Sequence, residues 1–375
     1  MAYLPTWGWD ECETDNPRTH FDSPASPQHV TDDSSIPLTE SPVGSTRQSV
    51  ISFKMVDEHE HITPDDDSAL GVNLEEESSL ASLRTSILEN KEENGRTYHS
   101  MSEGKYNFPN DDQENERLDL QHHIWKIQFD GKPALNPGAE NAKRVLDIGT
   151  GTGMWALDFA DAHPAAEVIG VDLSPVQPHW VPPNCRFEID DLEKDWTWSQ
   201  PFDFILCRGM SGCFADVPAL IQKAYDNLTP GGYFEVGDLS LPMGCDDGTV
   251  NKDSAIWKWH DALYEASKKI GRTIQSVAHD TTVLEKAGFV DIVHREFKWP
   301  FNSWARDPKL KEIGRWQCVN LDMGLEAFSL ALLTRVAGWS KEEVLASCAE
   351  VRKDIRNRRM HGYWTLHVVY ARKPE

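Results

Sequence analysis

The residues best suited to chemistry lie in the run from Val145 to Gly153, which reads VLDIGTGTG. Gly149, Gly151 and Gly153 permit a tight turn and let a ligand approach the backbone without Cβ clashes. Asp147 stands two positions before the first of these glycines. A carboxylate at that position suits the ammonium group of an amino-acid tail, directly or through water, and suits a pyrophosphate poorly.

Three further carboxylates follow the next two predicted strands. Asp172 lies nineteen residues after Gly153, where its carboxylate can accept two hydrogen bonds from a ribose diol. Asp190 or Asp191 can accept a hydrogen bond from an adenine amino group, and the spacing to Phe202 slightly favours Asp191. Together with the glycine turn, these residues predict a site for S-adenosylmethionine, which has an amino-acid tail and no phosphate.

A dinucleotide site is the main competing interpretation. Its pattern is G-x-G-x-x-G, whereas here Gly153 falls one residue early and residue 154 is Met154. The other alternative is a Rossmann-like fold with accidental glycines. S-adenosylmethionine is favoured because four features occur in order with suitable spacing: Asp-x-Gly-x-Gly-x-Gly, Asp172, the Asp190–Asp191 pair and the turn LTPGG.

The elements that must hold these residues alternate between strand and helix from Arg144 onward. Such alternation predicts an α/β fold with a mainly parallel sheet covered on both faces. Ligands bind at the carboxyl ends of such strands, where the glycine turn lies. We expect helices over residues 112–129, 154–162, 217–227, 252–270 and 281–287. The expected strands are RVLDI, EVIGVDL, CRFEI, FDFILC, YFEVGDL, VDIVHREF and WTLHVVYARK.

A helical insertion is expected over residues 300–360, between the last two strands. Ser340 and Glu343 are spaced as a capping box within it. The segment is longer than a hairpin needs. We expect it to cover the acceptor side of the site, with Trp304 and Trp316 lining an apolar pocket. The alternative is that it packs on the far side of the sheet, for stability or for a partner.

The first quarter of the 375-residue chain differs from the rest in composition. Residues 1–93 hold 20 acidic and 5 basic side chains, about two-thirds of the excess in a net charge of −24. They are rich in Ser, Pro and Thr and have little apolar content to bury, which predicts a disordered acidic tail. Neither part has the basic balance of a protein that grips phosphate backbones, so direct nucleic-acid binding is not expected.

Cysteine usage and hydropathy indicate an intracellular protein. The seven cysteines are scattered and contain no C-x-x-C pair, which argues against a disulfide framework and against a structural zinc site, so no metal is expected. The chain has no run of about 18 apolar residues, so no membrane span is expected. Its start has neither a basic segment nor an apolar run, so it is no secretory signal.

Three residues are candidates for the acceptor side of the site. Arg208 follows the fourth strand, and a structural salt bridge is its alternative role. Asp238 follows the fifth strand and either contacts an acceptor or accepts structural hydrogen bonds. Tyr98, in GRTYH, either folds over the cofactor or simply packs. No catalytic residue is assigned.

Longer stretches of the chain resemble the fungal LaeA-like methyltransferases, which belong to the class I, seven-stranded methyltransferases. The resemblance covers roughly residues 92–375, so it implies a methyltransferase domain over 94–375, with the last strand of its sheet antiparallel. It also implies that the cofactor residues are Asp147, the three glycines, Asp172 and the Asp190–Asp191 pair. The stretches are ENGRTYH, NDDQENERLDLQHH, LDIGTGTGMWALDFAD, VDLSPVQPHWVPPNCRFEIDDLEKDWTW, HDTTVLEKAGF and YARKP.

The resemblance also implies a role in fungal secondary metabolism. The expected activity is methyl transfer to an O, N or S nucleophile of a small-molecule or protein acceptor. Family members include a nuclear regulator that works with velvet proteins. A non-catalytic or weakly catalytic nuclear subunit of a velvet-type complex is therefore the alternative function, and both cytoplasm and nucleus stay open as locations.

Overall fold

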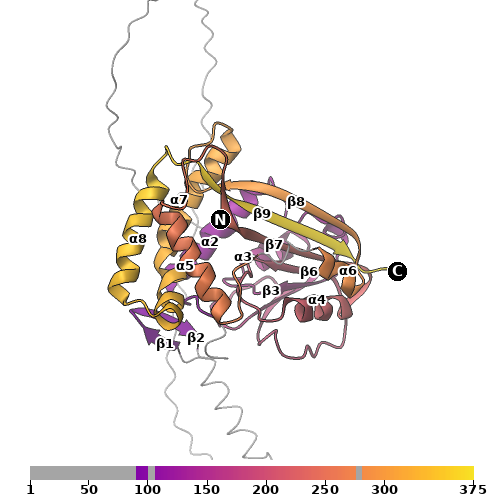
Figure 1. Ribbon diagram of the computed structural model, residues 1–375. Coiled ribbons are helices and arrows are strands. Elements are labelled where there is room, and N and C mark those ends of the chain that lie inside the picture. Colours follow the sequence, from indigo (N-terminus) through magenta and orange to yellow (C-terminus); the bar gives the residue numbers. More distant parts are fainter. Residues whose placement is uncertain (1–89, 100–105, 276–280) are drawn as a thin grey trace, which may run out of the picture. The chain divides into compact units, whose positions relative to one another are not determined.

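The computed structural model describes residues 90–99, 106–275 and 281–375, which all belong to one compact unit, Ala69–Glu375. The expected acidic tail lies outside the described residues up to residue 89. Seven strands form one sheet in the order β5-β4-β3-β6-β7-β9-β8, and Figure 1 shows helices packed beside it. Within the described ranges, no helix has both the length and the apolar content to cross a membrane.

The sheet confirms the predicted fold class. Strands β5, β4, β3, β6 and β7 are parallel neighbours, whereas β9 runs antiparallel to both β7 and β8. β7 is longer than expected at both ends, because it begins with the LTPGG turn that was predicted to precede it and continues to Cys245. The strands are β3 (Arg144–Ile148), β4 (Glu167–Asp172), β5 (Cys185–Ile189), β6 (Phe202–Arg208), β7 (Leu228–Cys245), β8 (Val290–Pro300) and β9 (Gly362–Arg372).

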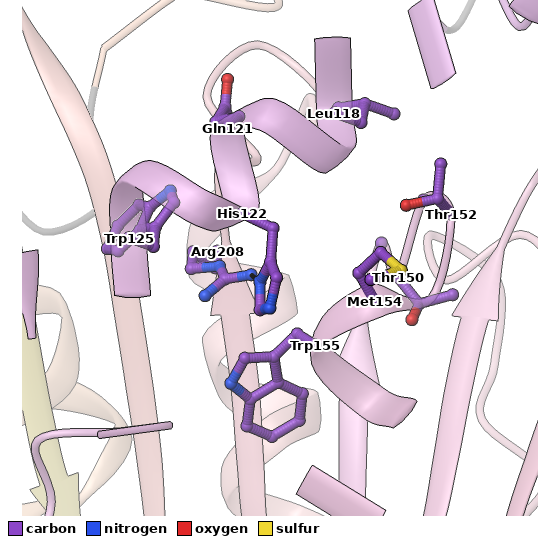
Figure 2. Close-up of a pocket in the computed structure, with 11 residues that line it drawn as sticks. Leu118, Gln121, His122, Trp125, Thr150, Thr152, Met154, Trp155 and Arg208 are labelled. Atoms are coloured by element: carbon purple, nitrogen blue, oxygen red, sulfur yellow. Dashed lines mark hydrogen bonds between the residues drawn. The ribbon is translucent and has the colours of Figure 1, made fainter. Parts of the chain in front are cut away.

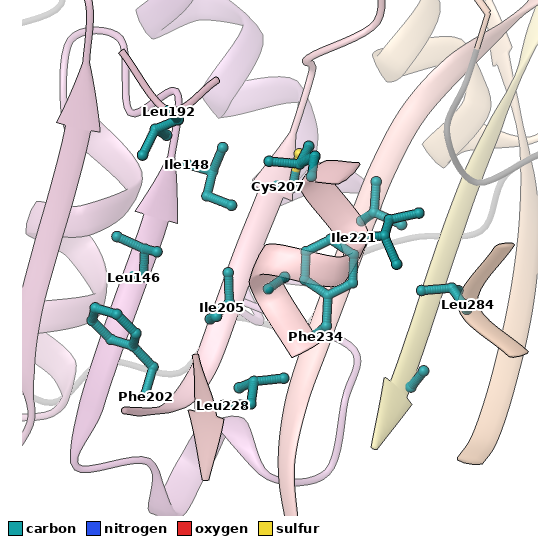
Figure 3. Packing of buried hydrophobic residues seen from close by; sticks show 14 of the residues in the cluster. Leu146, Ile148, Leu192, Phe202, Ile205, Cys207, Ile221, Leu228, Phe234 and Leu284 are labelled. Atoms are coloured by element: carbon teal, nitrogen blue, oxygen red, sulfur yellow. The ribbon is translucent and has the colours of Figure 1, made fainter. Parts of the chain in front are cut away.

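Alternating side chains give the central strands two apolar faces, as expected for a sheet covered on both sides. On β3, Leu146 and Ile148 pack toward Leu220 of α4 (Val217–Asp226) and Leu284 of α6 (Thr282–Ala287). Figure 3 shows this cluster between the strands and the helices. Val145 belongs to the opposite cluster, which also contains Trp155 and Phe159 of α3 (Met154–Ala162).

Helix α2 (Asp112–Gln128) packs on the antiparallel part of the sheet. Ile124 and Trp125 of α2 join Leu366 and Val368 of β9 in one buried cluster, together with Ile313 of α7 (Pro308–Leu332). The middle of α2 reaches the glycine turn, where the Thr152 hydroxyl donates to the Asp119 carboxylate over 2.6 Å. The helix therefore connects the insertion to the site.

The insertion over residues 300–360 is mainly helical, as predicted. It contains α7, the π-helical turn Leu333–Ala337 and α8 (Lys341–Arg356). α7 and α8 share a buried cluster with α5 (Ala255–Lys269). The predicted capping box is confirmed, since Glu343 N donates to Ser340 Oγ and Ser340 N donates to the Glu343 carboxylate.

A small hairpin at the start of the described chain was not predicted. β1 (Asn90–Glu93) pairs antiparallel with β2 (Arg96–His99), so four residues assigned to the tail form a strand. Asn94 and Gly95 both have positive φ in the connecting turn. Asn-Gly is the preferred sequence of such two-residue turns, so this dipeptide was the available signal.

Candidate functional site

The glycine turn connects β3 to α3 and has the expected left-handed backbone. Gly151 has a φ of 56° and Gly153, which caps α3, a φ of 82°. Residues other than glycine rarely adopt such positive φ values. The amide of Gly151 donates to Asp172 Oδ2 over 2.8 Å, so the turn is held against the end of the neighbouring strand.

The structure gathers most of the predicted residues at one edge of the sheet. Asp172 and Arg208 are the last residues of β4 and β6, Asp147 is the penultimate residue of β3, and Asp190 follows β5. These four strands are consecutive neighbours in the sheet and are parallel. Their carboxyl ends therefore converge, as ligand sites in such sheets require.

A cavity opens along this edge and contains about 760 Å³ of empty space, part of it continuous with solvent. Both charged and apolar residues line it. The lining residues are Tyr106, Leu118, Gln121, Gly149, Gly151, Val171, Asp172, Leu173, Asp190, Asp191, Leu192, Glu193, Arg208, Gly209, Met210, Cys213 and Phe214.

A second, smaller cavity lies on the other side of the glycine turn, beneath α2. Figure 2 shows Leu118, His122 and Trp125 of α2 facing Arg208 and the start of α3. Arg208, Leu118, Gln121, Gly149 and Gly151 line both cavities. The two cavities therefore adjoin each other at the glycine turn, and we treat them as two parts of one site.

Asp172 is built into the cavity wall. Its Oδ2 accepts from Gly151 N, and its Oδ1 accepts from Ser174 N over 3.0 Å. Each carboxylate oxygen keeps a further lone pair, so a ligand diol can still donate to Asp172. Burial raises the pKa of Asp172, although the backbone amides act against this rise.

Asp147 lies beneath the glycine turn and lines neither cavity. Only 4% of it is exposed, and its Oδ2 accepts from the hydroxyl of Thr150 over 2.7 Å. Burial raises the pKa of Asp147 to about 6. Thr150 does line the smaller cavity, so the contact of Asp147 with a ligand runs through this hydroxyl or through water.

The Asp190–Asp191 pair directly follows β5 and lies at the larger cavity. Asp190 is exposed, and its Oδ1 accepts from Asp191 N over 2.7 Å. Asp191 is only 3% exposed, and its Oδ1 accepts from Glu193 N. Both residues line the larger cavity, so neither is distinguished by position alone.

Arg208 is held by hydrogen bonding and stacking, and it forms no ion pair with a carboxylate in the described part of the chain. Its Nη2 donates to His122 Nδ1 over 2.9 Å, and the guanidinium lies over the ring of Trp125. Because Arg only donates, His122 Nδ1 is the acceptor and its Nε2 carries the proton, which it donates to Asp158. Burial lowers the pKa of Arg208 to about 10, so it remains cationic at neutral pH.

Asp238 has a structural role that sequence reasoning left as its alternative. It is 1% exposed and lines neither cavity. Its Oδ1 accepts from the backbone amide of Ser211, whose neighbours Met210 and Cys213 line the larger cavity. Burial raises the pKa of Asp238 to about 7. Asp238 thus positions a loop of the cavity wall.

Tyr98 likewise lines neither cavity. It is 2% exposed in β2, with the guanidinium of Arg335 over its ring, so the packing alternative holds in this structure. Tyr106 instead lines the larger cavity. Burial raises the pKa of Tyr106 well above its usual value, and its hydroxyl stays protonated. No feature of the sequence distinguishes the two tyrosines.

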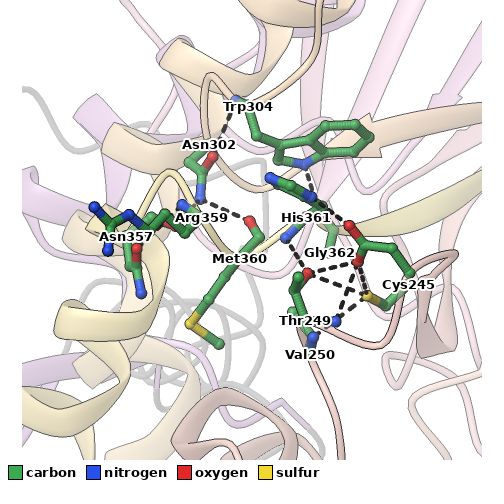
Figure 4. A network of polar contacts seen from close by, with 11 residues as sticks. Cys245, Thr249, Val250, Asn302, Trp304, Asn357, Arg359, Met360, His361 and Gly362 are labelled. Atoms are coloured by element: carbon green, nitrogen blue, oxygen red, sulfur yellow. Dashed lines mark hydrogen bonds and ion pairs between the residues drawn. The ribbon is translucent and has the colours of Figure 1, made fainter.

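The expected pocket roles of Trp304 and Trp316 are wrong for the two cavities found, since no residue of 300–360 lines either. Trp304 Nε1 donates to Gly362 O over 3.0 Å, and its ring contacts His361, in the polar network of Figure 4. Trp316 packs against His123 on α2. The insertion therefore supports α2 from behind, and α2 covers the site.

Comparisons with known proteins agree with this arrangement. A family model described as a methyltransferase domain matches residues 120–294. The chain is 42% identical over 303 residues to the methyltransferase pytC of Aspergillus terreus, which covers 80% of this chain and 94% of that protein. It is 38% identical to the secondary metabolism regulator LAE1 of Cochliobolus heterostrophus, over 76% of this chain and 94% of that one.

Solved structures are more distant. A phosphoethanolamine N-methyltransferase of Haemonchus contortus, solved with S-adenosylhomocysteine, superposes with a TM-score of 0.41 at 16% identity. The superposition covers 81% of this chain and 75% of the other.

Proposed function

Because this chain belongs to the LaeA-like fungal methyltransferases, we propose that it binds S-adenosylmethionine along the glycine-turn edge and transfers its methyl group in fungal secondary metabolism. Membership follows from the matches to pytC and LAE1, which cover nearly the whole of those proteins. The observation that carries the proposal is the convergence of Asp172, Asp190 and Arg208 on one cavity beside Gly151.

The charges around the cavity fit this cofactor better than a dinucleotide. S-adenosylmethionine has a diol at its ribose and a zwitterionic amino-acid tail, and it lacks phosphates. Asp172 offers acceptors for the diol, and the Asp190–Asp191 pair offers acceptors for the adenine amino group. Asp147, through Thr150, favours the ammonium. A pyrophosphate beside these carboxylates would be repelled.

Arg208 completes this set as the partner of the tail's carboxylate. It was expected on the acceptor side, but it lines both cavities next to Gly149 and Gly151. Its cationic guanidinium has a neutral histidine, His122, as its hydrogen-bond partner. Arg and carboxylate form strong, charge-assisted hydrogen bonds. We therefore assign Arg208 to the cofactor, together with Asp147 and Asp172.

When bound, S-adenosylmethionine supplies a sulfonium methyl group that an O, N or S nucleophile can take by displacement. The protein's task is to hold donor and acceptor in line and to exclude water. Burial raises the pKa of the Cys213 thiol well above its usual value, and Tyr106 stays protonated. These two cavity residues therefore act as wall residues and not as bases.

The acceptor's position is proposed beside the apolar residues of the larger cavity. These residues include Leu118, Met210 and Phe214, together with Tyr106 and Cys213. Such a wall suits a flat or hydrophobic acceptor group. The acceptor is either a small molecule or an exposed side chain of a protein.

An incubation with methyl-labelled S-adenosylmethionine and an extract of the source fungus separates these acceptors. Label recovered in a protein-free fraction indicates a small molecule, and label in precipitated protein indicates a side chain. The Asp172→Ala variant serves as the blank. Equal labelling by the native chain and this variant would contradict the proposed activity.

A regulatory role is the second candidate, favoured by the similarity to LAE1. In this alternative the chain acts in the nucleus as a cofactor-binding subunit of a velvet-type complex with little turnover of its own. Affinity capture from the same extract tests it. Stoichiometric recovery of a velvet-type protein, without label transfer to any fraction, would favour this alternative over the enzyme.

Cofactor affinity should depend on pH through Asp147. The pKa of the free carboxyl is about 6, and a bound ammonium favours the ionised form and lowers that pKa. The affinity for the cofactor is therefore highest above pH 6, where Asp147 is ionised. It falls as the pH drops below 6 and the carboxyl takes up a proton. We expect S-adenosylhomocysteine to bind about tenfold more weakly at pH 5 than at pH 7.5, as measured by calorimetry.

The Asp147→Asn variant is the matched control for this pH effect, because it keeps the shape and loses the titrating group. Asp172 also has a raised pKa, so a smaller dependence remains in the variant. A variant with the full dependence of the native chain would exclude Asp147 as its cause.

A further inference from the structure

A second group of chemically active side chains lies away from the cofactor cavity, on the antiparallel edge of the sheet. His294 and Glu296 are two residues apart on the edge strand β8, so their side chains point to the same face. Glu296 is the register partner of His367 on β9. Among the described residues, these three form the group whose nitrogen and carboxylate ligand atoms all lie within 4.8 Å of one another.

The three atoms form a triangle of the size that a metal ion requires. His294 Nε2 is 2.8 Å from His367 Nδ1, and Glu296 Oε1 is 3.5 Å from His367 Nδ1 and 3.9 Å from His294 Nε2. Two ligand atoms of tetrahedral zinc lie about 3.3 Å apart, given bonds of about 2.0–2.2 Å. The observed distances bracket this value, so small side-chain movements suffice to place an ion at bonding distance from all three.

The surroundings of His367 favour coordination through Nδ1. The residue is buried, and its Nε2 is 3.1 Å from Ser240 Oγ on β7. A proton donated from Nε2 to this hydroxyl leaves the Nδ1 lone pair directed toward His294 and Glu296. Metal-binding histidines usually have such a partner on the other ring nitrogen, which fixes the tautomer.

We propose that His294, Glu296 and His367 bind one zinc ion. Two imidazoles and one carboxylate are a ligand set that zinc accepts, and three protein ligands leave one position for water. The side chains of His294 and Glu296 are 30% and 60% exposed, so the open position and the entry path face solvent. The absence of a C-x-x-C pair is no objection, because this set contains no cysteine.

The ion would connect the edge strand to the interior of the sheet. β8 is an edge strand of the seven-stranded sheet, in which β9 is its one neighbour. An ion bound by both strands adds a direct link between them. Because zinc would bind the folded chain in preference to the unfolded one, it should raise the midpoint of thermal unfolding.

Calorimetric titration of the full, tag-free, chelator-treated chain with Zn²⁺ tests the site. We expect one equivalent to bind and the unfolding midpoint to rise with zinc. His294→Ala and Glu296→Gln should each weaken binding by about 100-fold or more and abolish the rise in the midpoint. Ser240→Ala, which removes only the partner of His367, should weaken binding by about 10- to 100-fold.

His361→Ala is the matched control, because His361 directly precedes β9 and also lies beside a carboxylate, Asp247. It should leave zinc binding unchanged. Glu296 is exposed, so Glu296→Gln keeps the test valid if a histidine variant fails to fold. The proposal is overturned if the native chain binds no zinc, or if zinc binding survives in His294→Ala and Glu296→Gln. If the native chain binds no zinc, the contact between His294 and His367 is only an N–H···N hydrogen bond.

Discussion

The Asp172→Ala variant is expected to bind S-adenosylhomocysteine about 10- to 100-fold more weakly than the native chain. Hydrogen bonds to a charged group contribute about 1.5–3 kcal/mol each, and tenfold in affinity corresponds to about 1.4 kcal/mol. The variant also loses the acceptor that holds Gly151 N, so the glycine turn loosens. Calorimetry at neutral pH measures the loss directly.

Asp161→Ala is the control for this experiment, since Asp161 is an exposed carboxylate on α3. Its affinity should equal that of the native chain. A folded Asp172→Ala protein with native affinity would remove Asp172 from the cofactor site. Because the ribose is affected, 5′-methylthioadenosine, which has the same ribose and adenine and lacks the amino-acid tail, should lose affinity to the same extent.

The Arg208→Ala variant is expected to discriminate between these two ligands. Its affinity for S-adenosylhomocysteine should fall about 10- to 100-fold, because a charge-assisted contact to the tail's carboxylate is lost. Its affinity for 5′-methylthioadenosine should stay unchanged, since that ligand has no carboxylate. Calorimetry with both ligands on the same preparation gives the comparison.

Arg208→Lys should recover part of the lost affinity, because it restores the charge without the planar guanidinium. Equal weakening of both ligands would mean that Arg208 only shapes the cavity with His122 and Trp125. If neither ligand is weakened while methyl transfer falls, Arg208 belongs to the acceptor side, as the sequence first suggested.

Local sequence patterns predicted the sheet and the residues at its edge. Strands such as RVLDI and FDFILC combine β-propensity with flanking turns. Asp147 lies near the end of RVLDI, Arg208 directly follows FDFILC, and Asp172 ends the strand between them in sequence. In a parallel sheet, the carboxyl ends of strands share one edge. Position along a strand was therefore enough to predict which side chains converge.

The position of the helix that covers the site could not be predicted from local sequence patterns. Helix α2 was expected, but its placement over the glycine turn depends on contacts with residues about 200 positions away, such as the bond from Arg117 to Asn320. The same long-range packing placed Trp316 behind α2 and Tyr106 in the cavity. Helical periodicity predicts which face of a helix is buried, but it does not predict which other element that face packs against.

The histidine and glutamate cluster was missed for a related reason. His294 and Glu296 are close in sequence, but His367 is 73 residues from His294. Only the antiparallel register of β8 and β9 brings them together. A search restricted to short ligand spacings could not find this group.

A crystal structure with S-adenosylhomocysteine tests the central claim most directly. We expect one ligand at the glycine turn, with its ribose hydroxyls donating to Asp172, its adenine beside the Asp190–Asp191 pair and its carboxylate on Arg208. A ligand bound away from the glycine turn, or crystals that stay empty at saturating ligand, would contradict it.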